Sequence, residues 1–457
     1  MIANYFEKPS DISVKINNMI FIFICGLFIG LVSSQSLMDL FIIFTSLLSL
    51  FLLCKRKDFI FFKQISNLIF ISLFWGLVLV LGLKLQSDEG ASVGTVFRDF
   101  VWIVHLPLWF YLWSISRIKL KWVFYGLGIL SLAAFFAIVV YLIGYDPLQQ
   151  SWSDRAQNAL TFWRSGGFFS NAMALAQSYG PIAMILMPLS VYYLYQAFHQ
   201  WSLANKSKIK WTINLLFPST LSWFIPLTLG LTLLSIMFTF TRGVWLALTI
   251  TSLLGSFIYS RKMGLTFLIF LIVSGIFLLG AWPKFRERTF QVFNSETSYD
   301  SERVVLWKTN WYIFKKSPLL GIGYGENKRR LREFYDELDV PKGQFEGHAH
   351  NQYLHFLAGT GLIGLFFYLS WCVYFLKINF NLYKSTLNTK TQTSGNLMSE
   401  LNLFLLGLFL AQVAFHIGSF TESNFIIAKN RMLLVFIWSL VLYFKYIESD
   451  EKNLRLR

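Results

Sequence analysis

Charged residues and cysteines are both scarce in this chain. Only 14% of the 457 residues are Asp, Glu, Lys or Arg, whereas soluble domains carry about 25%. The three cysteines, Cys25, Cys54 and Cys372, all lie in or beside apolar runs, and no pair has the spacing of a metal site. We expect them to be inert packing residues. The composition therefore argues against a soluble domain and against a cysteine-ligated metal centre.

Long apolar runs recur along the whole length of the chain. Hydrophobic residues make up 55% of it, and its 48 Phe and 16 Trp fit lipid-facing surfaces and interfacial belts. A spanning helix needs about 20 mainly apolar residues, which gives about twelve spans here. The expected spans are 17–34, 37–53, 66–84, 99–115, 120–144, 171–198, 213–240, 243–260, 263–282, 352–377, 401–420 and 432–447. We predict an all-α polytopic membrane protein.

The formal net charge of +16 would by itself suit a nucleic-acid-binding protein. The basic residues lie mostly in short loops between apolar runs, however, where membrane topology accounts for them. Alternate loops hold them: Lys55, Arg56, Lys57, Lys63, Arg117, Lys119, Lys121, Lys206, Lys208, Lys210, Arg261, Lys262, Lys377, Lys384 and Lys390. We therefore expect membrane lipids and no nucleic acid as partners, with both termini in the cytoplasm.

This parity places four segments on the outer side of the membrane: 85–98, 145–170, 283–351 and 421–431. Only 283–351 is large, and it is too long to be a mere connector. An amphipathic helix is expected over 301–314, because apolar side chains recur there at helical spacing. Those side chains are Val304, Trp307, Trp311 and Phe314. We interpret the segment as a helical cap over the outer membrane face.

We therefore divide the chain into three parts. Residues 1–282 carry the first nine spans, 283–351 form the large outer loop with its amphipathic helices, and 352–457 hold the last three spans and a cytoplasmic tail.

Arg242 is the most informative single residue, because it lies between two apolar runs with almost no loop. An arginine at mid-membrane costs on the order of 2.5–3.5 kcal/mol, and less near an interface. Its fixed fork of donors suits a phosphate group. We interpret Arg242 as a guanidinium held at the outer boundary to bind phosphate. The alternative is an arginine that reaches the lipid head groups.

Two other arginines are weaker candidates. Arg303 lies at the start of the expected amphipathic helix, where it is either a second anion contact or a partner of nearby acidic residues. Arg164 precedes two glycines, which let a backbone approach a ligand closely. Asn171 then stands where a polar residue could cap the next helix.

His348, His350 and Asn351 lie where the large outer loop meets an apolar run. Imidazole titrates near neutral pH and can take a proton from a hydroxyl, so His350 is our candidate base. Asn351 could orient it or bind substrate hydroxyls. His348 shares a face with His350 in an extended chain but not in a helix. A His-x-His pair can bind zinc, but no third ligand is evident in the nearby sequence, so we predict no metal and no cofactor.

Four stretches, in order along 150–370, resemble the O-antigen ligase and polymerase superfamily of bacterial envelope glycosyltransferases. They are Arg164-x-x-Gly167-x-Phe169-x-Asn171, Thr241-Arg242-Gly243-x-x-Leu246-Ala247, Arg303-x-x-x-Trp307 leading to Pro318-Leu319-Leu320-Gly321-Ile322-Gly323, and His350-Asn351-x-x-Leu354 leading to Gly361-Leu362-Ile363-Gly364. The number of spans and the large outer loop before the histidines also match. The first third of the chain shows no motif of the family.

The resemblance implies a metal-independent GT-C-like enzyme of the bacterial inner membrane, with its active site facing the periplasm. Such enzymes use a glycan on undecaprenyl diphosphate as donor. In ligases of lipopolysaccharide biosynthesis the acceptor is a hydroxyl of lipid A-core, and in polymerases it is another lipid-linked repeat. By this resemblance Arg242 and Arg303 hold the donor diphosphate and His350 is the base. The remaining candidates for substrate binding are Arg164, Asn171, His348 and Asn351.

A ligase is therefore the leading expectation, and a polymerase of the same superfamily is the nearer alternative. A transporter of anionic lipid-linked sugars belongs to another class. Transporters often show internal repeats of hydropathy, which this sequence lacks, and paired histidines beside a long outer loop favour an enzyme. No phosphate-binding GxxxxGK loop is present. None is needed if the donor's diphosphate bond supplies the energy.

Overall fold

The computed structural model describes residues 13–57, 60–86, 93–116, 118, 120–146, 151–152, 172–206, 219–281, 283–290, 298–341, 347–390 and 400–455. Within these residues, twelve helices are long and apolar enough to cross a membrane. The prediction of an all-α polytopic membrane protein is therefore confirmed. Besides the helices, β1 (Tyr145–Asp146) and β2 (Ser151–Trp152) form a short antiparallel pair.

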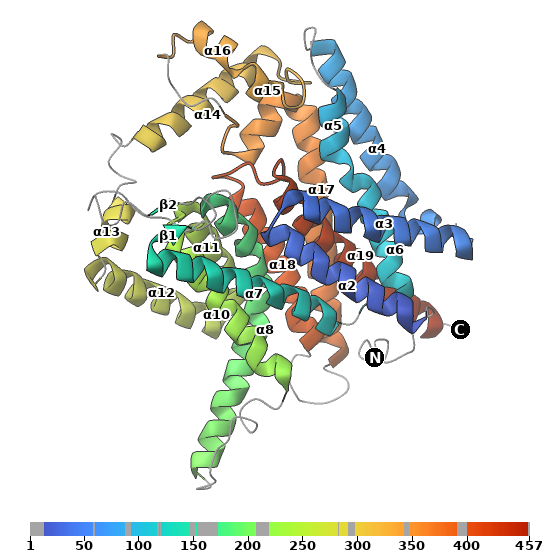
Figure 1. Cartoon of the computed structure of the whole chain (residues 1–457), viewed down its shortest axis with the longest axis vertical. Helices are drawn as coiled ribbons and strands as arrows, with labels where there is room; N and C mark the ends of the chain where they lie inside the picture. Colours follow the sequence, from blue (N-terminus) through green and yellow to red (C-terminus); the bar gives the residue numbers. More distant parts are fainter. Residues whose placement is uncertain are drawn as a thin grey trace.

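The helices follow the expected apolar runs in order (Figure 1). The first part of the chain forms α2 (Val14–Val32), α3 (Gln35–Arg56), α4 (Ile60–Gln86), α5 (Val93–Phe100), α6 (Trp102–Ser116), α7 (Leu120–Ile143), α8 (Ala172–Lys206), α10 (Thr220–Phe238), α11 (Arg242–Tyr259) and α12 (Arg261–Ala281). The second part forms α13 (Pro283–Phe290), α14 (Ser298–Lys316), α15 (Glu326–Arg329), α16 (Leu331–Glu337), α17 (Gln352–Lys390), α18 (Glu400–Gly418) and α19 (Ala428–Arg455).

Three helices run at least eight residues further than their apolar runs indicated, among them α19, which continues past the expected end at 447 to Arg455. The expected span 171–198 continues as α8 to Lys206, and the span 352–377 continues as α17 to Lys390. The extra turns of α17 still bury apolar side chains, including those of Leu382 and Tyr383. Lys377 and Lys384, which we expected in a loop, therefore lie on a helix.

The core is built around α8, α18 and α19. These helices pack on one another and carry many fully buried aromatic side chains. Two of the buried indoles donate hydrogen bonds to polar side chains inside this core, as a buried Trp N–H usually does. Trp113 Nε1 donates to the Ser439 hydroxyl at 2.8 Å, and Trp438 Nε1 donates to Gln412 Oε1 at 3.2 Å.

Three helices, α14, α15 and α16, lie together at one end of the molecule (Figure 1). The helix predicted over 301–314 is present within α14. Val304 and Trp311 are exposed, while Leu306 and Ile313 are fully buried beside two polar residues. On this buried side, Asn327 Nδ2, in α15, donates to Asn310 Oδ1 at 2.8 Å.

The turn after α14 packs backbone to backbone against α17. Gly323 N donates to the Gly359 carbonyl at 2.9 Å, and Leu362 N donates to the Pro318 carbonyl at 2.9 Å. Gly361, with φ +64°, interrupts the helix here, and a Cβ on it would lie 2.3 Å from the Leu319 carbonyl. The Pro-Leu-Leu-Gly-Ile-Gly and Gly-Leu-Ile-Gly motifs thus form one contact, which fixes α14 relative to α17.

Candidate active site

The short connection between α18 and α19, residues 419–427, links several elements that are far apart in sequence. Ser419 O accepts from the backbone N–H of Gln352, the first residue of α17, at 2.8 Å. In return, Gln352 Oε1 accepts from Phe425 N at 2.7 Å. Arg431 Nη1 holds the Phe425 carbonyl at 2.9 Å. These bonds fix the connection against the start of α17, directly after the histidine motif.

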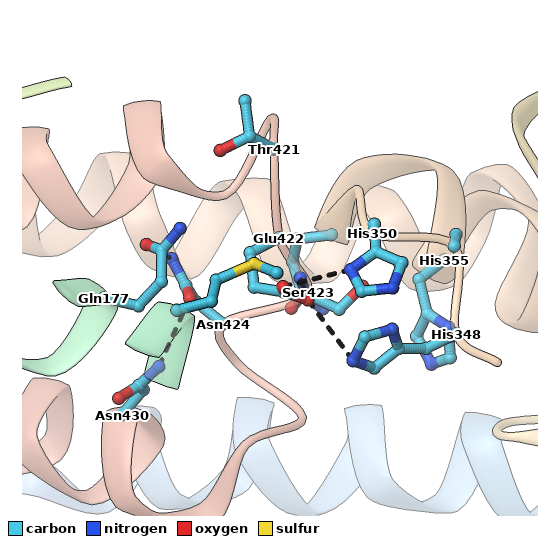
Figure 2. Close-up of polar contacts among 12 residues, drawn as sticks. Gln177, His348, His350, His355, Thr421, Glu422, Ser423, Asn424 and Asn430 are labelled. Carbon is cyan, nitrogen blue, oxygen red and sulfur yellow. Dashed lines mark hydrogen bonds and ion pairs between the residues drawn. The ribbon is translucent and has the colours of Figure 1, made fainter. Parts of the chain in front are cut away.

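Glu422 lies between the two histidines of that motif (Figure 2). Its Oε2 is 3.0 Å from Nδ1 of His350, and its Oε1 is 3.2 Å from Nε2 of His348. The carboxylate is buried, with 5% of its side chain exposed. One buried carboxylate therefore orients both imidazole rings.

The backbone around the histidines is held from the other side by α14. Trp307 Nε1 donates to the Ala349 carbonyl, between the two histidines, at 3.0 Å. His350 itself has φ +46°, a left-handed conformation that a residue with a Cβ seldom adopts. Such backbone strain is kept only where the surroundings enforce it, and it often marks a functional site.

The charges in this cluster follow from its burial. Burial by itself raises the pKa of Glu422, but the hydrogen bond from His350 and the nearby imidazoles outweigh it and lower that pKa below its usual value. Burial lowers the pKa of His348, although Glu422 opposes this. Among the residues that the structure describes, buried His348 Nδ1 has no hydrogen-bond partner, which suits a neutral ring that donates from Nε2. We conclude that Glu422 is ionised and His348 is neutral near pH 7.

The same three side chains could hold a metal ion. Ligand atoms of His348, His350 and Glu422 all lie within 4.8 Å of one another, and two histidines with a glutamate form one known catalytic zinc set. The third ligand missing from the nearby sequence is therefore supplied by a distant segment. The observed separations of 3.0 and 3.2 Å already satisfy direct hydrogen bonds between carboxylate and imidazole.

Arg242 is the half-buried first residue of α11. A cation at a helix N-terminus opposes the helix dipole, so the helix and the guanidinium together favour a bound anion. The turn before it is tight, since the buried Phe240 has φ +50°. The next residue, Gly243, lies directly against Thr421, because a Cβ there would meet Thr421 Oγ1 at 2.2 Å. The backbone beside Arg242 thus contacts the residue that precedes Glu422.

Arg303 approaches the same region from α14. Its Nη2 lies 3.9 Å from Sδ of Met173, in the first turn of α8. One turn further along α8, Gln177 Oε1 accepts from Asn424 Nδ2 of the 419–427 connection at 3.0 Å (Figure 2). Arg242 and His350 thus lie beside this connection, and Arg303 lies about one turn of α8 from Gln177, which is bonded to it.

The other sequence candidates divide into two groups. Asn351 Oδ1 accepts from Tyr353 N and Leu354 N at 3.0 and 3.1 Å, so its oxygen caps α17. A role for Asn351 toward substrate stays a prediction. Arg164 and Asn171 lie outside the described residues.

Glu422 is the residue that sequence reasoning missed. It is the one acidic residue between Leu401 and Tyr446, in a short polar stretch that the topology already placed on the outer side. An isolated carboxylate between two apolar runs was the available signal, but nothing in the sequence joins it to His350, 72 residues away.

Residues 227–369 match the family model described as O-Antigen ligase. The matched stretch begins in α10 and ends in α17, and it contains Arg242, Arg303, His348 and His350. Glu422 lies beyond it. No curated protein shows a significant match to the chain.

Proposed function

Because residues 227–369 carry the domain of the O-antigen ligase superfamily, whose members are glycosyltransferase-like membrane enzymes, we propose that this protein is a ligase. It moves a glycan from undecaprenyl diphosphate to a hydroxyl of an acceptor such as lipid A-core. The reaction takes place at the periplasmic face of a bacterial inner membrane, with both termini in the cytoplasm. The large loop 283–351 serves as the periplasmic cap.

The pairing of His350 with Glu422 is the observation that carries this proposal. With Nδ1–H directed at the carboxylate, Nε2 of His350 is left as the acceptor nitrogen. A carboxylate in this position fixes the ring and stabilises the imidazolium that forms when the base takes a proton. The proton comes from the acceptor hydroxyl. A general base of this kind contributes about 10²–10⁴ in rate.

The arginines act on the leaving group. The acceptor oxygen forms a bond to the anomeric carbon while the bond from that carbon to the diphosphate oxygen breaks, and the diphosphate leaves with the electron pair. Negative charge grows on the diphosphate, and preorganised donors in a dry site stabilise such charge strongly. Arg242, at the N-terminus of α11, and Arg303, on α14, are the donors we propose.

This single displacement inverts the anomeric centre and needs no metal ion. The diphosphate bond of the donor supplies the energy. Arg164, Asn171, His348 and Asn351 are our candidates for contacts to the glycan or the acceptor.

A polymerase that joins lipid-linked repeats to one another would use the same groups, and the family match covers both activities. The products distinguish them. Purified protein is supplied with a lipid-linked donor, with and without lipid A-core, and the products are separated by size. We expect one-step attachment that requires lipid A-core. A ladder formed without lipid A-core would overturn the ligase assignment in favour of a polymerase, and binding without any transfer would favour a transporter.

A further inference from the structure

A cavity of about 450 Å³ lies between α8, α11 and α18, within the usual size range of ligand sites. It is lined mainly by apolar side chains, and three small residues of α11, Ser252, Gly255 and Ser256, leave the space open. Val191 on α8 and Tyr259 on α11 line it and are 47% and 48% exposed. The cavity therefore opens to the outside between candidate membrane helices, where the surrounding medium is lipid.

The cavity lies on the same helix as Arg242. Arg242, Trp245, Thr249, Ser252, Ser256 and Tyr259 recur at alternating spacings of three and four residues along α11. This spacing places them on one stripe of the helix. At 1.5 Å per residue, the stripe runs from Arg242 to the first cavity residue over roughly 15 Å. A molecule with an anionic head and a long apolar tail fits this stripe, with its head at the guanidinium.

We propose that the cavity binds a middle segment of the polyprenyl tail of the lipid-linked donor, an inference that rests on the proposed function. The head-to-tail distance favours this occupant. A diphosphate held at Arg242 has its first isoprene units beside Trp245 and Thr249, and only a long chain continues past Ser252 into the cavity. The side chain of Thr249 is exposed and that of Trp245 is half-buried, so this path along the helix is open.

Tail length is the property to vary. Two donors with the same glycan, one on undecaprenyl diphosphate and one on geranyl diphosphate, are compared in the full-length protein. The short geranyl chain ends before the cavity. Ser256→Trp fills the cavity from α11, and Val191→Trp closes its mouth from an exposed position on α8. Leu254→Trp is the matched control, since Leu254 is 39% exposed on α11 but does not line the cavity.

We expect Ser256→Trp and Val191→Trp to raise KM for the undecaprenyl donor at least about tenfold, because excluding a few buried methylene groups already amounts to that ratio. KM for the geranyl donor should not change, and Leu254→Trp should behave as wild type with both donors. An equal rise with both donors, or none in either variant, overturns the inference.

A binding measurement separates this inference from the proposed activity. Undecaprenyl phosphate with a photoreactive group on the part of its tail that lies roughly 15–25 Å from the phosphate, the distance from Arg242 to the cavity residues along α11, is crosslinked to wild-type protein, and the labelled residues are mapped. Labelling of α8, α11 and α18 around the cavity, lost in Val191→Trp, supports the site even if no transfer is found. Labelling elsewhere, or labelling that a phosphatidylethanolamine competitor removes as readily as unlabelled undecaprenyl phosphate, contradicts it.

Discussion

Glu422 Oε2 lies 3.0 Å from Nδ1 of His350, although the two residues are 72 positions apart in the chain. This contact joins the connection between α18 and α19 to the segment that precedes α17. It also explains how a histidine at the end of a long loop is held in one orientation. Most of the proposed chemistry depends on this orientation.

Glu422→Gln should keep the size of the side chain and remove its charge. We expect kcat to fall about 10²-fold or more, the lower end of what a general base contributes, with the donor KM unchanged because Glu422 does not hold the donor. Steady-state transfer kinetics on purified protein measure both. Glu333→Gln is the control, since Glu333 is exposed on α16 and pairs with Arg330 there. A rise in KM with normal kcat would show that Glu422 binds substrate instead.

Arg242→Lys keeps the positive charge and loses the planar fork of donors. If the guanidinium group of Arg242 binds the diphosphate, the transfer rate should fall about 10²–10³-fold, the typical cost of one lost hydrogen-bond donor. Arg261→Lys is the matched change, at the exposed first residue of α12. The two variants are compared by their initial rates at equal protein concentration. Similar rates in both would indicate that Arg242 serves only as a membrane anchor.

Gly243→Ala should displace the connection that carries Glu422, because the added Cβ would meet Thr421 at 2.2 Å. We expect lower transfer from this variant. Thr421→Gly removes the atoms that clash, so the double variant should recover part of the activity, and a double-mutant cycle measures the coupling. Gly230→Ala on α10, where nothing lies within 4 Å of the new Cβ, should behave as wild type. If the double variant recovers no activity, the proposed coupling of Arg242 to Glu422 through the contact between Gly243 and Thr421 is contradicted.

The stability of the protein should fall as the pH drops below about 6.5, the ordinary pKa of histidine. Burial lowers the pKa of His348 in the folded state, so the unfolded chain binds more protons in this range and unfolding is favoured. The lowered pKa of Glu422 acts in the same direction only at more acidic pH, below about 4.3. Tm should therefore decrease between roughly pH 7.5 and 5.5, and less so in His348→Gln. Equal decreases in both proteins would contradict this assignment.

The membrane architecture was predictable because each spanning helix appears in the sequence as a long run of apolar residues. The ends of α8 and α17 were not predictable from the sequence. Their last turns combine apolar residues with lysines and other polar residues, a composition that is typical of a loop. The polar partner of Asn310 on α14 was also not predicted. That partner is Asn327, and helical periodicity does not indicate a partner on another segment.

The candidate site divides in the same way. Arg242 and His350 stand out locally, one as a cation between apolar runs and the other beside a second imidazole. Glu422 and Thr421 bring these two regions together only through tertiary packing, so the sequence could not assign them. The interrupted helix at Gly361 was predicted in part. Its motif was recognised in the sequence, but its contact with Leu319 was not predicted.

The transfer rates of His350→Ala and Arg242→Ala test the central claim most directly. Purified wild-type and variant proteins are treated with a chelator and given lipid-linked donor and acceptor without added metal. The account predicts full activity for wild type, a loss of about 10²–10⁴ for His350→Ala, and a loss at least as large for Arg242→Ala. Wild-type rates in both variants at normal expression, or a wild-type activity that the chelator abolishes and a divalent metal restores, would contradict it.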